Sequence, residues 1–497
     1  MSEALQVSGS VAATAAVAVA ILAPGRRLGA AAMIGALAIA AALILGEGWA
    51  ELESLRDRPA LAAALTLAGA TALAALAEAL RRVPILLPLL LVAALPFRVP
   101  IDVNGTDANL LLPLYAVIGA GAVGFALDAW RRPGVGEDRP SLLLRGALAV
   151  AIILYALQAA YSEDIGFATR NVGFFLVPFA AMFALLARVE WTPRLLVAAL
   201  GVLVGEALLF ATVGIGQHLV GEIFWNSLLE RSNDFHFYFR VNSLFWDPNI
   251  YGRYLALAAV LVMTLLVWTR EPRRILQLAA IVAVVFAGLV FGFSQTSFLA
   301  LLAGVAVICA LRWSVRWTVI ALPFATAAVL AAVVVIGGTS EAEDDPEEVT
   351  SGRSTLIGGG IDLARAEPLI GHGSASFPEA FREQERVKSN RPAISHNEPV
   401  TVAAEQGAVG VVVYLALLAA AFSTLLGGMR RIAPGLGAPE RAIGDPAEGA
   451  GAVALARIAI LAGFVALLVH TVGYAGYLTD PLAWALLAIG GSLAGRR

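Results

Sequence analysis

The sequence contains little cysteine, lysine or charge, and each shortage excludes a class of protein. The single cysteine, Cys309, lies in an apolar run, so no intramolecular disulfide can form and the chain is not a disulfide-stapled secreted domain. The single lysine is Lys388, so the positive charge is almost all arginine, and these arginines are scattered between apolar runs. Because they form no basic surface, we expect no nucleic-acid partner. Charged residues make up 14% of the chain, well below the roughly 25% of an ordinary soluble domain.

Hydrophobic residues, by contrast, make up 59% of the 497 residues, and the mean hydropathy is +0.81. A soluble protein of this length could not bury so much apolar surface. A helix needs roughly 20 apolar residues to cross a hydrocarbon core ~30 Å thick, and such runs recur along the sequence. We therefore predict an all-α fold, a polytopic transmembrane helix bundle of about 13–15 spans. The expected spans are 8–24, 28–46, 60–80, 83–97, 108–130, 142–160, 171–187, 194–220, 249–268, 274–292, 296–311, 315–337, 397–427, 452–471 and 480–494.

Pairs of neighbouring arginines indicate how the spans are oriented. They occur in every second connection between spans, so all of them lie on the same side of the membrane. They are Arg26/Arg27, Arg81/Arg82, Arg131/Arg132, Arg188/Arg194, Arg273/Arg274, Arg312/Arg316, Arg430/Arg431 and Arg496/Arg497. By the positive-inside rule, the side of the membrane that carries these arginines is the cytoplasmic side. The histidines then all map to the outer face or to the outer ends of spans; they are His218, His236, His372, His396 and His470. We therefore expect any chemistry to face outward.

This topology divides the chain into three parts. Residues 1–337 carry the first twelve expected transmembrane helices, 338–395 form the largest extracytoplasmic loop, and 396–497 carry the C-terminal transmembrane helices. Residues 1–24 have no basic n-region, so we expect a retained span rather than a cleaved signal peptide.

The large loop should form a small helical subdomain. Arg353 and Arg365 lie in an amphipathic stretch, and a second short helix, 378–388, should start at Pro378. The acidic run 341–348 lacks the glycine and the ligand spacing of a calcium loop, so we interpret it as a mobile solvated strip.

A second informative segment precedes the span at 249. Asp247 followed by Pro248 predicts a helix start, with Asp247 as N-cap and Pro248 at the first helical position. Arg253 lies about one turn inside the membrane boundary, where an arginine is costly. It either snorkels to the interface or binds an anion, and Arg240 is a second candidate for anion binding.

The most informative segment is SHNEPVTVAAEQGAVGVVVY, residues 395–414. Ser395 and Glu398 have capping-box spacing, so His396 should lie at a helix N-terminus, where an anionic ligand is favoured. There His396 is either an ordinary interfacial residue or a base for a substrate hydroxyl. Glu405 lies about two turns deeper, where a carboxylate needs partners. No metal-binding or nucleotide-binding motif occurs in the sequence, so we expect no metal and no cofactor.

The chain contains, in this order, the pieces PFRVPIDVNGTDANLLLPLY (96–115), YSEDIGFATRNVGFFLVPF (161–179), RVNSLFWDPNIYGRYLAL (240–257), FSQTSFLAL (293–301), GRSTLIGGGIDLARAEPLIGHGSASF (352–377), residues 395–414 and HTVGYAGYLTDPLAWALL (470–487). Together these pieces resemble the O-antigen ligase and polymerase superfamily of bacterial membrane glycosyltransferases. The resemblance implies transfer of a glycan from an undecaprenyl diphosphate carrier to an acceptor hydroxyl, at the outer face of the cytoplasmic membrane. The implied partners are that lipid-linked donor, a glycan, lipid or protein acceptor, and membrane lipids.

The resemblance also implies roles for individual residues. His396 would act on the acceptor, and Arg240 and Arg353 would bind the diphosphate, with Arg170 as a weaker candidate. Many members have Ser-Arg where this sequence has Ser294-Gln295, so one diphosphate contact is either missing or supplied by Arg253. The supporting residues would be Asp247, Asn249, Gln295, Glu398 and Glu405. An in-line attack would invert the anomeric centre, without a metal.

Three other functions share parts of this pattern. A glycan polymerase and a protein O-oligosaccharyltransferase use the same donor and differ in the acceptor. A lipid-glycan flippase or exporter is the non-enzyme alternative, and it should show charges deep within spans and broken helices near the membrane midplane.

Overall fold

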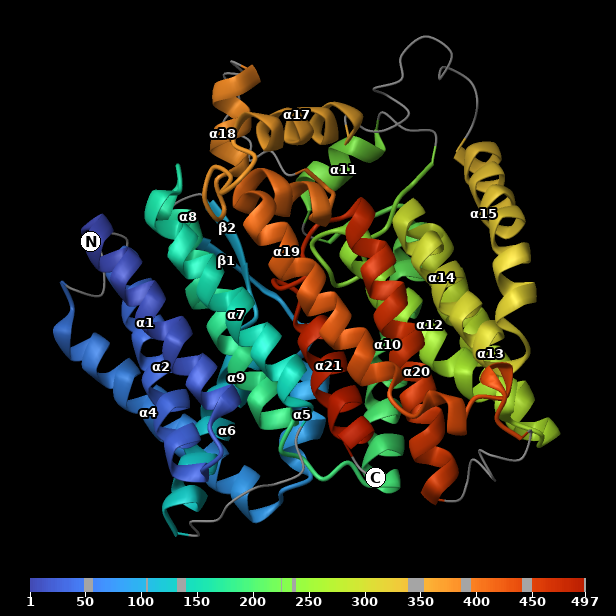
Figure 1. The fold of residues 1–497 in the computed structure, drawn as a ribbon, viewed down its shortest axis with the longest axis horizontal. Helices are drawn as coiled ribbons and strands as arrows, with labels where there is room; N and C mark the ends of the chain where they lie inside the picture. The colour runs from blue at the N-terminus through green and yellow to red at the C-terminus, as the bar shows by residue number, and fades with distance from the viewer. Residues whose placement is uncertain are drawn as a thin grey trace. The chain divides into compact units, whose positions relative to one another are not determined.

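The structure is a computed structural model, and it describes residues 1–48, 57–103, 106–131, 140–224, 226–234, 238–337, 353–385, 395–439 and 449–495 (Figure 1). Most of these residues are helical. The first helices in the chain are α1 (Glu3–Leu22), α2 (Arg26–Glu47), α4 (Pro59–Arg82), α5 (Leu86–Ala94), α6 (Leu112–Arg131), α7 (Leu142–Gln158), α8 (Ile165–Asn171), α9 (Val177–Leu186), α10 (Pro193–Val220) and α11 (Ser227–Asn233). They are followed by α12 (Pro248–Trp268), α13 (Pro272–Phe291), α14 (Gln295–Arg312), α15 (Val315–Gly337), α17 (Arg353–Ala366), α18 (Phe377–Glu385), α19 (Glu398–Leu426), α20 (Gly449–Gly473) and α21 (Pro481–Gly495). Four short helical turns complete the set: 3-10 turns at Ala159–Tyr161, Met429–Arg431 and Pro434–Leu436, and a π-helical turn at Val172–Leu176.

The predicted all-α membrane bundle is confirmed. Twelve helices within the described residues are long and apolar enough to cross a membrane. Two shorter apolar segments accompany them, Val315–Ala328 in the first part of α15 and Pro481–Gly495, which is α21. The chain is therefore a multi-pass membrane protein.

The predicted span at 83–97 is wrong. The helix there, α5, has nine residues, less than half of the roughly 20 that a crossing needs. Pro84 and Pro96 lie on the two sides of α5, and a proline ends a helix because it has no N–H to donate and its ring clashes with the carbonyl four residues earlier. A two-stranded antiparallel hairpin follows, β1 (Val99–Val103) and β2 (Thr106–Leu110), so the next helix starts at Leu112 rather than at 108.

The chain forms two compact units, each assembled from separate stretches of sequence. Unit 1 comprises Met1–Val189, Arg353–Thr424 and Ala475–Arg497, and unit 2 comprises Glu190–Gly352 and Leu425–Tyr474. The three-part division at 337 and 395 follows the expected membrane topology and stays a prediction.

Helix α9 forms the centre of unit 1. All ten of its residues are buried, and it contacts α1, α2, α6 and α21. The ring of Phe183 meets that of Trp484 edge-on at 6.2 Å, and Ser492 donates a hydrogen bond to the carbonyl of Ala187. These contacts hold the C-terminal helix α21 against α9.

Helix α12 occupies the corresponding place in unit 2, where it contacts α10, α13, α14 and α20. Small residues let its neighbours approach closely. A Cβ on Gly252 would lie 2.5 Å from the Oγ of Ser297 on α14. The beginning of α12 is therefore packed against the beginning of α14.

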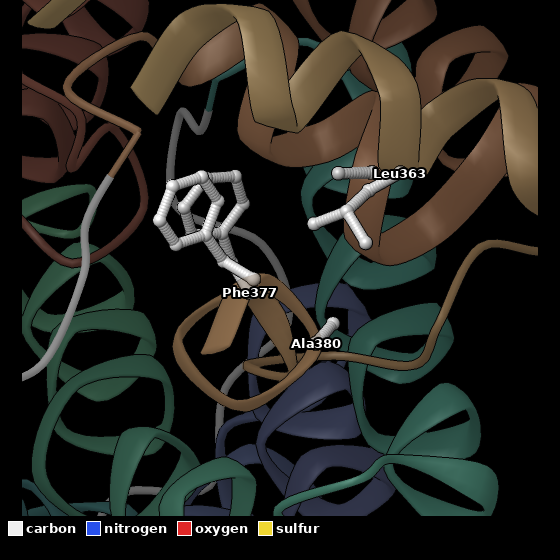
Figure 2. Close-up of a cluster of buried hydrophobic side chains, with 5 residues drawn as sticks. Leu363, Phe377 and Ala380 are labelled. Carbon is white, nitrogen blue, oxygen red and sulfur yellow. The ribbon is translucent and has the colours of Figure 1, made fainter. Parts of the chain in front are cut away.

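The large loop contains two short helices, as predicted, and they pack on the start of α19. Figure 2 shows Leu363 of α17 beside Phe377 and Ala380 of α18, and Phe381 and Ala404 complete this buried cluster. The rings of Phe377 and Phe381 stack with centroids 5.8 Å apart. This hydrophobic core fixes α17 and α18 to the beginning of α19 within unit 1 (Figure 1).

Candidate functional site

The start of α12 confirms the predicted cap. Asp247 accepts a hydrogen bond from the backbone N–H of Asn249 at 2.6 Å, and Pro248 is the first helical residue. The second carboxylate oxygen of Asp247 accepts a hydrogen bond from the hydroxyl of Tyr474 at 3.1 Å. Asp247 is therefore held by two groups of unit 2.

Arg240 lies in the segment that leads to this cap. Its backbone N–H and carbonyl both pair with the side chain of Asn233 at 3.0 Å, and its Nε donates to the carbonyl of Gly292 at 3.4 Å. Among the described residues, none accepts a hydrogen bond from its two terminal amino groups. Burial lowers the pKa of the Arg240 guanidinium, and the carboxylate of Asp247 opposes part of that shift. The guanidinium remains charged, so Arg240 combines a partly buried positive charge with unused donors.

Arg253 is held inside unit 2. It is 5% exposed, its Nε donates to Nδ1 of His470 at 3.1 Å, and its Nη2 donates to the carbonyl of Tyr474 at 3.0 Å. The guanidinium also lies over the ring of Tyr474, 5.3 Å from its centroid. These contacts account for the buried position of Arg253 without snorkelling, and its role in binding an anion stays a prediction.

The sequence did not single out a buried polar cluster that joins α12, α14 and α20. His470 is fully buried, and its Nε2 lies 3.1 Å from the Oγ of Ser297. Ser297 donates to Ser294 at 2.8 Å, and Ser294 donates to Oδ1 of Asn249 at 2.9 Å. The run Ser294-Gln295-Thr296-Ser297 at a helix start was the available signal. Gln295 itself is exposed, and no described residue bonds its side chain.

His396 lies two residues before the start of α19, in unit 1. Its φ is 55°, a left-handed conformation that is uncommon for a residue other than glycine. The predicted capping box is wrong, because the helix starts at Glu398 and Asn397 is the cap, accepting a hydrogen bond from the N–H of Val400 at 3.0 Å. Ser395 instead bonds Asn397, since the turn at His396 moves the cap two residues along the chain.

Both glutamates of this segment hold backbone groups. Glu398 accepts a hydrogen bond from the N–H of Gly476 at 2.6 Å. Glu405 accepts from the N–H groups of Ala375 at 2.9 Å and Phe377 at 3.3 Å, just before α18. These contacts supply the partners that a carboxylate within a span requires.

Helix α19 is broken two residues after Glu405. Gly407 has φ 61° and ψ −162°, and the carbonyl groups of Pro368 and Leu369 accept hydrogen bonds from Ala408 and Val409. A Cβ on Gly407 would lie 2.5 Å from the backbone of Leu369. The break is therefore a close junction between the loop and the span, closed by backbone hydrogen bonds.

The other predicted residues are placed as follows. Arg170, on α8, pairs with Glu47 at 2.5 Å and its side chain is 47% exposed. Arg353 is the first residue of α17, and its side chain lies outside the described residues, as do His236 and the acidic run 341–348. Thus Arg240, Arg253, Asp247, Asn249 and Gln295 belong to unit 2, and Arg170, Arg353, His396, Glu398 and Glu405 belong to unit 1.

One family model matches part of the chain. Residues 284–415 match the model of the O-antigen ligase family. The resemblance to the O-antigen ligase superfamily is thereby confirmed over these residues. The matched range runs from the end of α13 to the middle of α19, so it includes Ser294, Ser297 and His396 and leaves Arg240 and His470 outside. None of the curated proteins matches the chain.

Proposed function

We propose that the protein is a membrane glycosyltransferase of the O-antigen ligase type. It transfers a glycan from an undecaprenyl diphosphate carrier to an acceptor hydroxyl, at the outer face of the cytoplasmic membrane. The family match over residues 284–415 carries this proposal, since it covers both the start of α14 and the junction where His396 precedes α19.

Arg240 is the best-supported diphosphate ligand. Its Nε and backbone are held by unit 2, while its terminal amino groups have no acceptor among the described residues. The planar guanidinium matches phosphate oxygens and stays charged. Arg353 and Arg170 remain further candidates, and Arg170 would have to exchange its ion pair with Glu47 for the ligand.

His396 is the proposed catalytic residue. In the reaction it accepts the proton of the acceptor hydroxyl as that oxygen forms a bond to the anomeric carbon. The bond from the anomeric carbon to the diphosphate breaks, and its electron pair leaves with the diphosphate, where the arginine charge stabilises it. Attack opposite the leaving group inverts the anomeric centre, and no metal is required because the diphosphate already activates the donor.

The flippase alternative is less well supported. The broken helix α19 is a feature of transporters when it lies near the membrane midplane. Here the break comes nine residues after α19 begins. The nearby carboxylate of Glu405 accepts hydrogen bonds from the backbone N–H groups of Ala375 and Phe377, so it is not free to bind a substrate. We interpret the break as the anchor of the loop.

The experiment compares purified wild type with His396→Ala, using lipid-linked glycan from the source cells. We expect wild type to release undecaprenyl diphosphate and His396→Ala to bind the donor without releasing the carrier. His372→Gln is the matched control, because it alters another histidine of unit 1 that pairs with Glu163. Equal release by His396→Ala and wild type would contradict the proposed role. A ladder of lengthening lipid-linked products would identify a polymerase.

A further inference from the structure

The buried cluster of unit 2 forms a continuous chain of hydrogen bonds. It runs from Arg253 to His470, then to Ser297, Ser294 and Asn249, with donor–acceptor distances of 3.1, 3.1, 2.8 and 2.9 Å. All five residues are at most 7% exposed. The chain thus connects the end of α20 with the first turn of α12 entirely through buried polar groups.

The guanidinium of Arg253 decides which nitrogen of His470 carries a proton. An arginine can only donate hydrogen bonds, so Nδ1 of His470 must accept from Nε of Arg253. His470 is therefore neutral, with its proton on Nε2. That proton points to the Oγ of Ser297 at 3.1 Å, with Thr296 a more distant acceptor at 3.4 Å.

The remaining hydrogen bonds then have one direction. Ser297 accepts from His470 and donates its own proton to Ser294, and Ser294 donates to Oδ1 of Asn249. With Oδ1 of Asn249 engaged, its Nδ2 amino group is turned away from the serines. Among the described residues, nothing accepts a hydrogen bond from that Nδ2, although the residue is 93% buried, being 7% exposed.

Asn249 and Arg240 present unused donors on the same part of unit 2. Asp247 interacts with both residues. Its carboxylate accepts a hydrogen bond from the backbone N–H of Asn249, and its negative charge raises the pKa of the Arg240 guanidinium. The Nδ2 atom of Asn249 is not shielded from solvent, so an acceptor that comes from outside the protein can reach it. An anion with several oxygens, such as a diphosphate, supplies acceptors for both residues.

We propose that His470 is a positioning residue for the diphosphate: as the Nε2–H tautomer it orients Ser297, Ser294 and the amide of Asn249, so that Nδ2 of Asn249 donates to a diphosphate oxygen. This inference rests on the proposed function, because it assumes a polyprenyl diphosphate ligand. It assigns a function to two serines inside the family match and to one histidine outside it.

The test measures the dissociation constants of undecaprenyl diphosphate and undecaprenyl monophosphate for the full-length protein in lipid nanodiscs. Ser297→Ala interrupts the chain with the loss of one oxygen, and we expect about tenfold weaker diphosphate binding, with a smaller loss for monophosphate. Thr264→Val is the matched control, because Thr264 of α12 is, like Ser297 of α14, a buried hydroxyl residue, and its hydroxyl bonds only the carbonyl of Val260 in its own helix.

Two substitutions of His470 separate positioning from packing. The side-chain amide of His470→Gln can take the place of Nε2–H and donate to Ser297, whereas the oxygen of His470→Asn can replace only the acceptor at Nδ1. We expect His470→Gln to bind the diphosphate within about threefold of wild type and His470→Asn to resemble Ser297→Ala.

The outcomes distinguish this inference from the proposed function. If wild type binds neither lipid phosphate, the proposed function fails and the inference fails with it. If wild type prefers the diphosphate but Ser297→Ala keeps that preference, only the inference is overturned. Diphosphate binding that is kept in His470→Asn and lost in His470→Gln would also overturn the inference, since His470 would then serve only to hold Arg253.

Discussion

Replacing Glu405 should release the start of α18 from α19. Glu405 accepts hydrogen bonds from the N–H groups of Ala375 and Phe377, both only 2% exposed. Leaving a buried donor unsatisfied costs about 1–3 kcal/mol. Glu405→Ala leaves two such donors, so we expect the free energy of opening of this segment to fall by about 2–6 kcal/mol. Glu405→Gln keeps one oxygen that can accept from one of these two N–H groups, but it turns an amino group towards the other. The free energy of opening should therefore fall by about half as much as in Glu405→Ala.

Hydrogen–deuterium exchange of the purified protein measures this effect where it occurs. The amides at 375–385 should exchange faster in Glu405→Ala than in wild type, with Glu405→Gln between them. Glu367→Ala is the control, because that side chain is exposed and has no partner among the described residues; a surface change of this kind costs less than about 0.5 kcal/mol. If exchange at 375–385 were the same in Glu405→Ala and Glu367→Ala, the carboxylate would not hold α18.

Three further substitutions test other contacts. Gly359→Ala adds a Cβ that overlaps a phenylalanine ring of the cluster in Figure 2, so the free energy of unfolding, measured by thermal denaturation, should fall by about 1–3 kcal/mol. Gly358→Ala is the control, because nothing lies within 4 Å of a Cβ there, and equal destabilisation by the two substitutions would contradict the packing argument. Asp247→Ala removes the cap of α12, so stability should fall by about 1 kcal/mol in the same assay, and an unchanged midpoint would mean that the cap is dispensable. Arg170→Ala breaks a half-exposed ion pair with Glu47, so unfolding should change by less than about 1 kcal/mol, and a larger loss would show that the pair is structural.

The parts of the fold that depend on local sequence could be predicted. Long apolar runs predict membrane helices because each helix must satisfy its own backbone hydrogen bonds in lipid. The Asp247-Pro248 start of α12 and the two short helices of the loop follow from similarly local signals. The short α5 could also have been predicted, since Pro84 and Pro96 lie at its two sides in the sequence.

The helix start near His396 shows where local signals are insufficient. Ser395 and Glu398 have the spacing of a capping box, yet Asn397 is the cap. The left-handed turn at His396 and the hydrogen bond from Gly476 to Glu398 make Asn397, rather than Ser395, the cap of α19. The second of these comes from a segment 78 residues away, so no local pattern could reveal it.

The amino-acid sequence alone predicts a multi-pass helical membrane protein, the helix start at Asp247, and His396 and Arg240 as candidate site residues. The contacts of each polar side chain became known only from the folded structure. Arg253 became a partner of His470 rather than an interfacial cation, and Glu405 became a cap for α18 rather than an isolated charge. The reason is physical: apolar burial follows composition and is visible in any window of sequence, whereas a hydrogen bond needs two particular atoms about 3 Å apart. In this chain those atoms come from residues as far apart as 253 and 470, and folding alone brings them together.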